Sequence, residues 1–240
     1  MITNAQTNTR VDEIGDRIYR ISTPVPTVPG GFSFNRYLVV DDAPLLFHTG
    51  PRGMFPLTRE AIAAVVPVER LRFVAYSHWE NDESGALNQL LAVAPEAVPV
   101  CSRVNAMVNG DACDRPPRAL ADGEALSLGT RRVRWVDAPH VPHAWECGYL
   151  FEPASRTFFC GDLFTQPGLG EAALTEGDIL GPSEQLRGAL DYYAHARDTR
   201  AQLERLAKEL PAATLACMHG SAWRGDGAAL LRALADRVTA

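Results

Sequence analysis

SHWENDESG, residues 77–85, follows directly on a strand-like apolar run and contains four ligand-type side chains: His78, Glu80, Asp82 and Glu83. Imidazole nitrogens and carboxylate oxygens are common ligands of divalent transition metals. In an extended segment the alternate residues 78, 80 and 82 point to one side and can share a cation. Singly, Glu80 is also explained as a solvated side chain, and Asp82 and Glu83 as acids favoured at the start of a following helix. Their density in one short segment favours a metal site.

Three later segments also place a ligand-type residue at or just beyond the end of an apolar strand. They read VDAPHVPH at 136–143, FFCGD at 158–162 and LACMHG at 215–220, and they supply His140 or His143, Asp162 and His219. Burying an isolated acid or imidazole there costs free energy unless a partner compensates it. A shared metal centre is the simplest such partner, and the glycines at 161 and 220 allow the backbone to approach it closely.

Composition indicates a packed globular protein. Hydrophobic residues make up 46% of the 240 positions and charged residues 22%, which argues against disorder. The formal charge is -6 and no Lys or Arg stripe is present, so the electrostatic footprint of a nucleic-acid binder is missing. The N-terminus has no signal-peptide core, and no apolar run approaches the roughly 20 residues of a membrane span. We therefore expect a cytoplasmic protein without nucleic-acid or membrane partners.

The five cysteines are odd in number, scattered, and never form a C-x-x-C pair. We expect reduced and mostly buried thiols, because free cysteine behaves as a small core residue.

Strand and helix patterns alternate along both halves of the chain. Apolar, β-branched or aromatic runs predict strands at 17–21, 34–40, 44–47, 71–76, 132–136, 148–152, 157–160 and 213–217. Apolar residues at helical spacing predict helices at 55–66, 84–94, 183–210 and 227–238. The stretch 111–129 is loop-like, either a lid or a turn-rich connection. No Ser/Gly linker or charge run divides the chain, so we expect one α/β domain over residues 1–240.

The order of these ligand types resembles the metallo-β-lactamase superfamily. His-x-Glu-x-Asp at 78–82, then His, then Gly-Asp at 161–162, then His-Gly at 219–220 follow the superfamily's order over most of the chain. The resemblance implies an αββα sandwich, in which two mixed sheets are flanked by helices. The usual motif has His where this chain has Glu80, and this Glu is similar to that of the flavodiiron proteins and the oxygen-binding diiron proteins.

The resemblance also implies how the ligands share two metal ions. It assigns six residues: His78, Glu80 and His143 to the first ion, Asp82 and His219 to the second, and Asp162 as the bridge. The segment 143–162 matches the family without a gap, which favours His143 over His140. Where the family has a further His, this chain has Glu83, which we expect to act as an additional oxygen ligand; the alternative is an acid that only favours the start of a helix.

The charges of the expected ligands indicate which metal ions they suit. Four carboxylates would balance two divalent ions while the three histidines stay neutral. Such a set suits iron or manganese, so we expect iron, with zinc or manganese as the alternatives. His48 stands where the superfamily commonly has an Asp near the site. It is either a hydrogen-bond partner that orients a ligand or the cap of a strand end.

Three functions are compatible with this site. The first is a non-haem diiron protein that binds or reduces dioxygen or nitric oxide, which calls for a separate electron donor. The second is a metal-dependent hydrolase of an ester, thioester or lactone as a small-molecule substrate, with Asp82 or Glu83 guiding the water nucleophile. The third is a non-catalytic sensor. A homodimer is compatible with each of them.

Overall fold

Two sheets lie at the centre of the computed structural model, which describes residues 1–239. The first sheet has eight strands in sequence order: β1 (Ile2–Asn4), β2 (Thr9–Gly15), β3 (Ile18–Val25), β4 (Phe32–Val39), β5 (Leu45–Phe47), β6 (Phe73–Ala75), β7 (Val98–Ser102) and β8 (Arg118–Leu120). The second sheet has seven strands in the order β13 (Leu174–Thr175), β15 (Ala222–Arg224), β14 (Thr214–Cys217), β12 (Thr157–Gly161), β11 (Gly148–Glu152), β10 (Arg132–Asp137) and β9 (Ala125–Ser127). Both sheets are mixed, because each contains parallel and antiparallel pairs.

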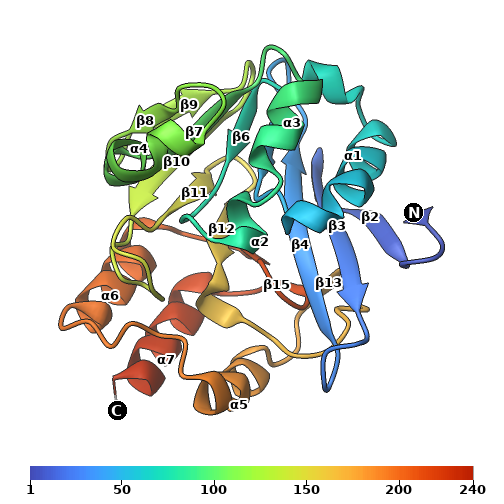
Figure 1. The fold of residues 1–240 in the computed structure, drawn as a ribbon. Helices are drawn as coiled ribbons and strands as arrows, with labels where there is room; N and C mark the ends of the chain where they lie inside the picture. Colours follow the sequence, from blue (N-terminus) through green and yellow to red (C-terminus); the bar gives the residue numbers. More distant parts are fainter. Residues whose placement is uncertain (240) are drawn as a thin grey trace.

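Helices cover the outer face of each sheet. The first half contributes α1 (Phe55–Ala63), α2 (Asn81–Ser84), α3 (Leu87–Val93) and α4 (Arg103–Asn109), and the second half contributes α5 (Leu180–Leu190), α6 (Thr199–Glu209) and α7 (Gly227–Val238). In Figure 1, α1 and α3 lie over the first sheet, and α6 and α7 lie beside the second.

Three buried clusters separate these layers. On β4, Leu38 packs with residues of α1 and α3, whereas its neighbours Tyr37 and Val39 pack between the sheets. On β12, Phe159 packs between the sheets, whereas Phe158 faces the cluster formed with α6 and α7. Since successive side chains of a strand point to opposite faces, both sheets are buried on both sides. The predicted αββα arrangement with two mixed sheets is confirmed.

The strand predictions largely match the structure. The predicted strand 148–152 and helix 227–238 coincide with β11 and α7, and the other predicted strands fall on β3, β4, β5, β6, β10, β12 and β14 with shifted ends. The strands β1, β2, β7, β13 and β15 were not predicted. The stretch 111–129 is not only a loop, because it contains β8 and β9, the edge strands of the two sheets.

The prediction of one helix over 183–210 is wrong. The chain forms α5, leaves the helix at Asp191 with φ of 48°, and starts α6 at Thr199. A left-handed residue ends a helix, and the intervening segment then hydrogen-bonds to the segments that follow β10 and β12, through the Ala194 amide to Pro142 and the Tyr193 hydroxyl to Leu163. The helix predicted at 84–94 is also divided, since α2 ends at Ser84 and α3 begins at Leu87.

Two composition-based expectations can also be compared with the structure. All five cysteines are free and buried, as expected. None of the helices within residues 1–239 has the length and apolar character that a membrane crossing needs.

Candidate metal centre

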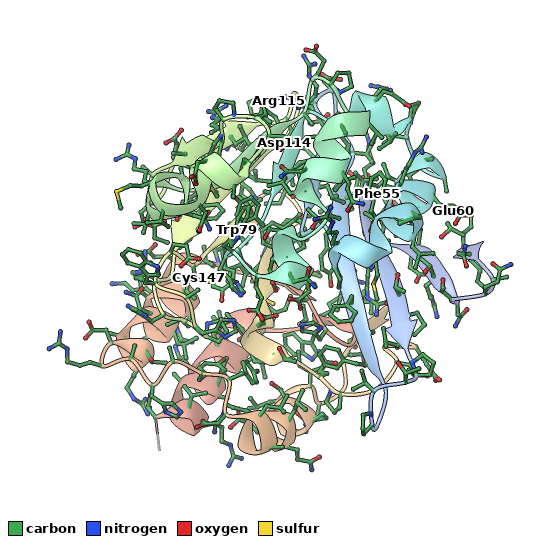
Figure 2. All side chains as sticks on the ribbon, viewed as in Figure 1. Phe55, Glu60, Trp79, Asp114, Arg115 and Cys147 are labelled. Atoms are coloured by element: carbon green, nitrogen blue, oxygen red, sulfur yellow. The ribbon has the colours of Figure 1, made fainter. Side chains whose placement is uncertain are left out.

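The predicted ligands converge at one edge of the two sheets. His78 follows β6, His143 lies in the connection from β10 to β11, Asp162 follows β12, and His219 follows β14. In Figure 1, α2 lies in the middle of the molecule near the end of β12. Figure 2 labels Trp79 and Cys147 on the neighbouring segments after β6 and before β11, where the Trp79 amide donates to the Glu146 side chain at 3.1 Å.

The segment 77–85 is not extended throughout, so the expected alternation at 78, 80 and 82 is wrong. Glu80 has extended backbone angles, but α2 begins at Asn81 and contains Asp82 and Glu83. Both acids lie in the first turn of this helix, where its dipole favours negative charge. The helical turn points the two side chains in different directions. Asp82 Oδ2 lies 3.4 Å from His219 Nε2, whereas Glu83 Oε2 lies 3.8 Å from His78 Nε2.

The first group of ligand atoms belongs to His78, Glu80 and His143. The two Nε2 atoms lie 2.9 Å apart, and Glu80 Oε2 lies 3.1 Å from each. Two N–H groups cannot face each other at this distance, so at least one nitrogen presents a lone pair. Nitrogen ligands about 2.0–2.1 Å from one ion, at roughly right angles, are separated by about 3 Å. The group therefore has the dimensions of a shared cation site.

Asp162 lies between this group and a second one. Its Oδ2 lies 3.7 Å from the Nε2 atoms of both His78 and His143, whereas its Oδ1 lies 3.3 Å from His219 Nε2. The two oxygens of one carboxylate thus face two sets of histidines. The positive φ of Gly161, 51°, turns the chain from β12 toward the site at this point.

Glu83 is fully buried, and neither carboxylate oxygen has a hydrogen-bond partner within residues 1–239. A buried carboxylate without partners is strongly unfavourable unless a cation compensates it. Glu83 has an oxygen within 4.8 Å of ligand atoms of both His78 and Asp162, and one within 4.8 Å of ligand atoms of both Glu80 and Asp82. The orphaned oxygens, together with the nitrogen and oxygen donors around them, fit bound metal ions.

The Nδ1 atoms of the three histidines face away from the cluster. His143 Nδ1 lies 2.9 Å from the Tyr192 carbonyl, and His219 Nδ1 lies 2.9 Å from the Ser33 carbonyl. A carbonyl can only accept, so Nδ1 carries the hydrogen and Nε2 is left to bind a cation. Sequence reasoning missed both partners, since a backbone carbonyl has no sequence signature. His78 Nδ1 instead faces the Ser77 hydroxyl at 2.9 Å.

The carboxylates shift the pKa values of the histidines. Burial alone would lower the pKa of His219, but the hydrogen bonds and charges of Asp162 and Asp82 outweigh it and raise the pKa to about 10. For His78, burial is likewise outweighed, above all by the charge of Glu83, and its pKa lies well above the usual value. Protons therefore compensate the negative charge of this cluster wherever no cation does.

The pKa values of the acids differ with their surroundings. The hydrogen bond from His143, followed by that from His78, lowers the pKa of Glu80 to about 2. Burial, reinforced by the charge of Asp162, raises the pKa of Glu83 well above its usual value. Outside the ligand cluster, burial lowers the pKa of His48 to about 3, so this imidazole is neutral.

His140 lies outside the cluster. Its side chain is exposed, its φ is 63°, and it lines a surface cavity with Arg197 and Asp198. The structure therefore brings His143, and not His140, to the other ligand candidates. His195, in the connection between α5 and α6, is exposed and pairs with Asp191 at 2.7 Å.

A family model described as ODP family beta lactamase matches residues 32–220, the part of the chain that contains every ligand candidate. The chain belongs to this family. Among curated proteins, this ODP family member is similar to a nitric oxide reductase of Moorella thermoacetica, with 24% identity over 217 residues. The match covers 85% of this chain and 53% of the relative, so the chain spans about half of that protein's length.

Solved structures show the same fold. The metal-soaked Flv1 flavodiiron core of Synechocystis sp. PCC6803 matches with a TM-score of 0.82 and 19% identity, covering 96% of this chain and 61% of that one. Rubredoxin oxygen:oxidoreductase from Desulfovibrio gigas matches with a TM-score of 0.81 and 20% identity, covering 95% and 60%. This member of the ODP family therefore has the metallo-β-lactamase fold in the form found in flavodiiron proteins.

Proposed function

We propose that this chain holds two iron ions and uses them to bind or reduce a diatomic gas, dioxygen or nitric oxide. The observation that carries the proposal is the position of Asp162, whose Oδ2 faces His78 and His143 while its Oδ1 faces His219. A carboxylate placed in this way can offer one oxygen to each of two ions. The names of the matched nitric oxide reductase and oxygen:oxidoreductase support the choice of gas.

The ligand set divides into two groups around Asp162. We assign His78, Glu80 and His143 to the first ion, Asp82 and His219 to the second, Asp162 to both, and Glu83 as an additional ligand between them. Four carboxylates with three histidines suit iron or manganese better than a histidine-rich set does. We propose that Asp82 and Glu83 also influence the chemistry at the ions, because their side chains face His219 and His78.

When bound, a pair of ferrous ions supplies two electrons to the gas. Asp162 would hold both ions, and the other side chains of the site would shape the access to them. On the side of the second ion, the rings of Phe32 and Phe34 pack against His219 at centroid distances of 4.3 and 5.4 Å. This apolar wall admits a small gas more readily than a charged substrate. Glu80 and His143 form the exposed side of the site.

Four further assignments go with this function. We propose that residues 1–240 form one metallo-β-lactamase-like domain, because no linker-like segment divides the sequence. A cytoplasmic location is supported by five free cysteines, since disulfides form in oxidising compartments. Turnover needs a separate electron donor, because the ligand cluster contains only histidines and carboxylates. We also propose a homodimer, which a measurement of molecular mass in solution would test.

Metal analysis combined with gas consumption tests the proposal. Protein produced without added metal and purified without oxygen should contain two irons per chain, change its visible spectrum on exposure to air, and consume dioxygen or nitric oxide when a chemical reductant is supplied. A colourless zinc protein that hydrolyses esters, thioesters or lactones would instead assign the site to hydrolysis. The Asp162→Ala variant should lose both metal and gas consumption.

A further inference from the structure

His78 differs from His143 and His219 in the group that its Nδ1 atom contacts. Carbonyls accept from the Nδ1 atoms of His143 and His219, but His78 Nδ1 faces the Ser77 hydroxyl. A hydroxyl can donate or accept, so Ser77 alone does not decide which nitrogen of His78 carries the hydrogen. The wrong tautomer would put N–H on Nε2, which faces Glu80 and His143, and would remove the lone pair needed by a cation.

A second buried histidine decides the direction of this hydrogen bond. His48 Nε2 lies 3.0 Å from Ser77 Oγ, and His48 Nδ1 lies 3.0 Å from Met218 Sδ. A thioether sulfur only accepts, so the single hydrogen of a neutral His48 lies on Nδ1. His48 Nε2 must then accept from the Ser77 hydroxyl. Because Ser77 has one hydrogen, it can only accept from His78, which fixes that hydrogen on His78 Nδ1.

The backbone and packing hold His48 in this place. Its φ is 67°, its amide donates to the Ala75 carbonyl at 2.8 Å, and its ring stacks on Phe47 at 4.1 Å. Its side chain is buried, and its ring nitrogens contact a hydroxyl and a thioether. Burial without an acidic hydrogen-bond partner favours the neutral ring. A costly positive φ at a buried non-glycine residue is consistent with a positioning role.

We propose that His48 and Ser77 are positioning residues that hold His78 in the Nδ1–H tautomer, so that Nε2 is available to the metal. This inference rests on the proposed function insofar as His78 is a ligand. The chain of hydrogen bonds runs from His78, after the first sheet's β6, to Met218, which precedes His219 after the second sheet's β14. It therefore connects ligands that come from both sheets.

Zinc binding to the full chain tests the inference, because zinc is diamagnetic and its affinity can be measured by competition with a chelator. Ser77→Ala should bind zinc 10–100-fold more weakly, the usual effect of removing a group that orients a ligand. Ser77→Thr, which keeps the hydroxyl, should restore most of this affinity. His48→Asn tolerates positive φ but is too short to reach Ser77, so it should weaken zinc binding as Ser77→Ala does.

Nitrogen-15 spectra of the histidine rings provide the second measurement. In zinc-loaded wild type, the His78 Nδ1 hydrogen should exchange slowly with water, and in Ser77→Ala and His48→Asn it should exchange faster, because its ordered acceptor is lost. Unfolding of the metal-free variants separates this effect from a general loss of structure. If both variants bind zinc like wild type and their His78 Nδ1 hydrogen exchanges as slowly as in wild type, the inference is overturned while the site stands. If His78→Ala binds zinc like wild type, the ligand assignment fails instead.

Discussion

The outer and inner sides of the candidate metal-ligand cluster use the same residue types in opposite surroundings. On the outer side, 53% of the Glu80 side chain and 25% of the His143 side chain are exposed. On the inner side, the side chains of Glu83, Asp162 and His219 are 0%, 7% and 5% exposed. Water can solvate the outer groups, whereas the inner charges depend on each other, on protons or on a cation. The inner side should therefore determine metal retention, and the outer side access to the ions.

The largest effect is expected at Asp162, the inner carboxylate that faces both histidine groups. Asp162→Ala should reduce the metal content from two ions to less than one, because it removes an oxygen from each ion. The matched control is His140→Ala, which changes an exposed histidine nearby and should keep both ions. Metal analysis after gel filtration measures this. Equal metal content in the two variants would show the bridging assignment to be wrong.

A smaller loss is expected from Glu83→Gln, which keeps the shape of the inner side and removes one charge. Metal affinity should fall about 10–100-fold, and metal-free protein should be no less stable than wild type. At a metal concentration 100 times Kd, binding stabilises wild type by about 2.7 kcal/mol, and a 100-fold weaker variant gains only about 0.4 kcal/mol. Thermal unfolding with and without zinc measures this difference. A Glu83→Gln protein stabilised by zinc as much as wild type would contradict the role of Glu83.

The pH dependence of metal binding should also distinguish the inner side of the cluster from the outer side. His219 has a pKa raised to about 10, so near neutral pH it carries a proton that a metal must displace. Raising the pH from 7 toward 10 should therefore strengthen zinc binding by up to about tenfold per unit for this proton, and the gain should end above about 10. Glu80, with a pKa of about 2, is already ionised and contributes nothing in this range. Chelator competition at pH 7, 8 and 9 should show this slope; a flat profile would contradict it.

The smallest effect is expected for the stability of the metal-free protein when the outer side of the cluster is changed. Glu80→Ala should change the free energy of unfolding of the metal-free protein by no more than about 0.5 kcal/mol, because an exposed ion pair contributes little. Zinc affinity should nevertheless fall, since Glu80 Oε2 lies 3.1 Å from both His78 and His143. A large loss of stability in the metal-free protein would show that the outer side is as dependent on its charges as the inner side.

Local sequence patterns predicted much of the fold. Strands such as β11 are marked by apolar runs between turn residues, and α7 by helical spacing. The helix predicted at 183–210 failed because its periodicity continues through residues 191–198. There, hydrogen bonds to other segments prevail, such as those from Tyr193 Oη to the Leu163 carbonyl and from the Ala194 amide to the Pro142 carbonyl. Such tertiary contacts leave no trace in local spacing.

For the site, the sequence predicted the ligand side chains but not the groups that orient them. The resemblance named six side chains that the structure brings together, including His143 in place of His140, and the sequence added Glu83 where the family has His. It gave no information on the carbonyls of Ser33 and Tyr192, because any residue type could supply them. Ser77 was part of the quoted motif, but only the position of His48 reveals the direction of its hydrogen bond.

The segment between α5 and α6 should influence how fast bound ions exchange with solution. Its Tyr192 carbonyl accepts from His143, and the Tyr192 hydroxyl donates to the Asp162 carbonyl at 3.2 Å. A local opening of this one segment would thus free the orientation of two ligands simultaneously. Short irregular segments open far more often than sheet cores do. The rate at which bound ions exchange with solution should therefore follow the opening of residues 191–198, and hydrogen exchange at the Ala194 amide would report the same event.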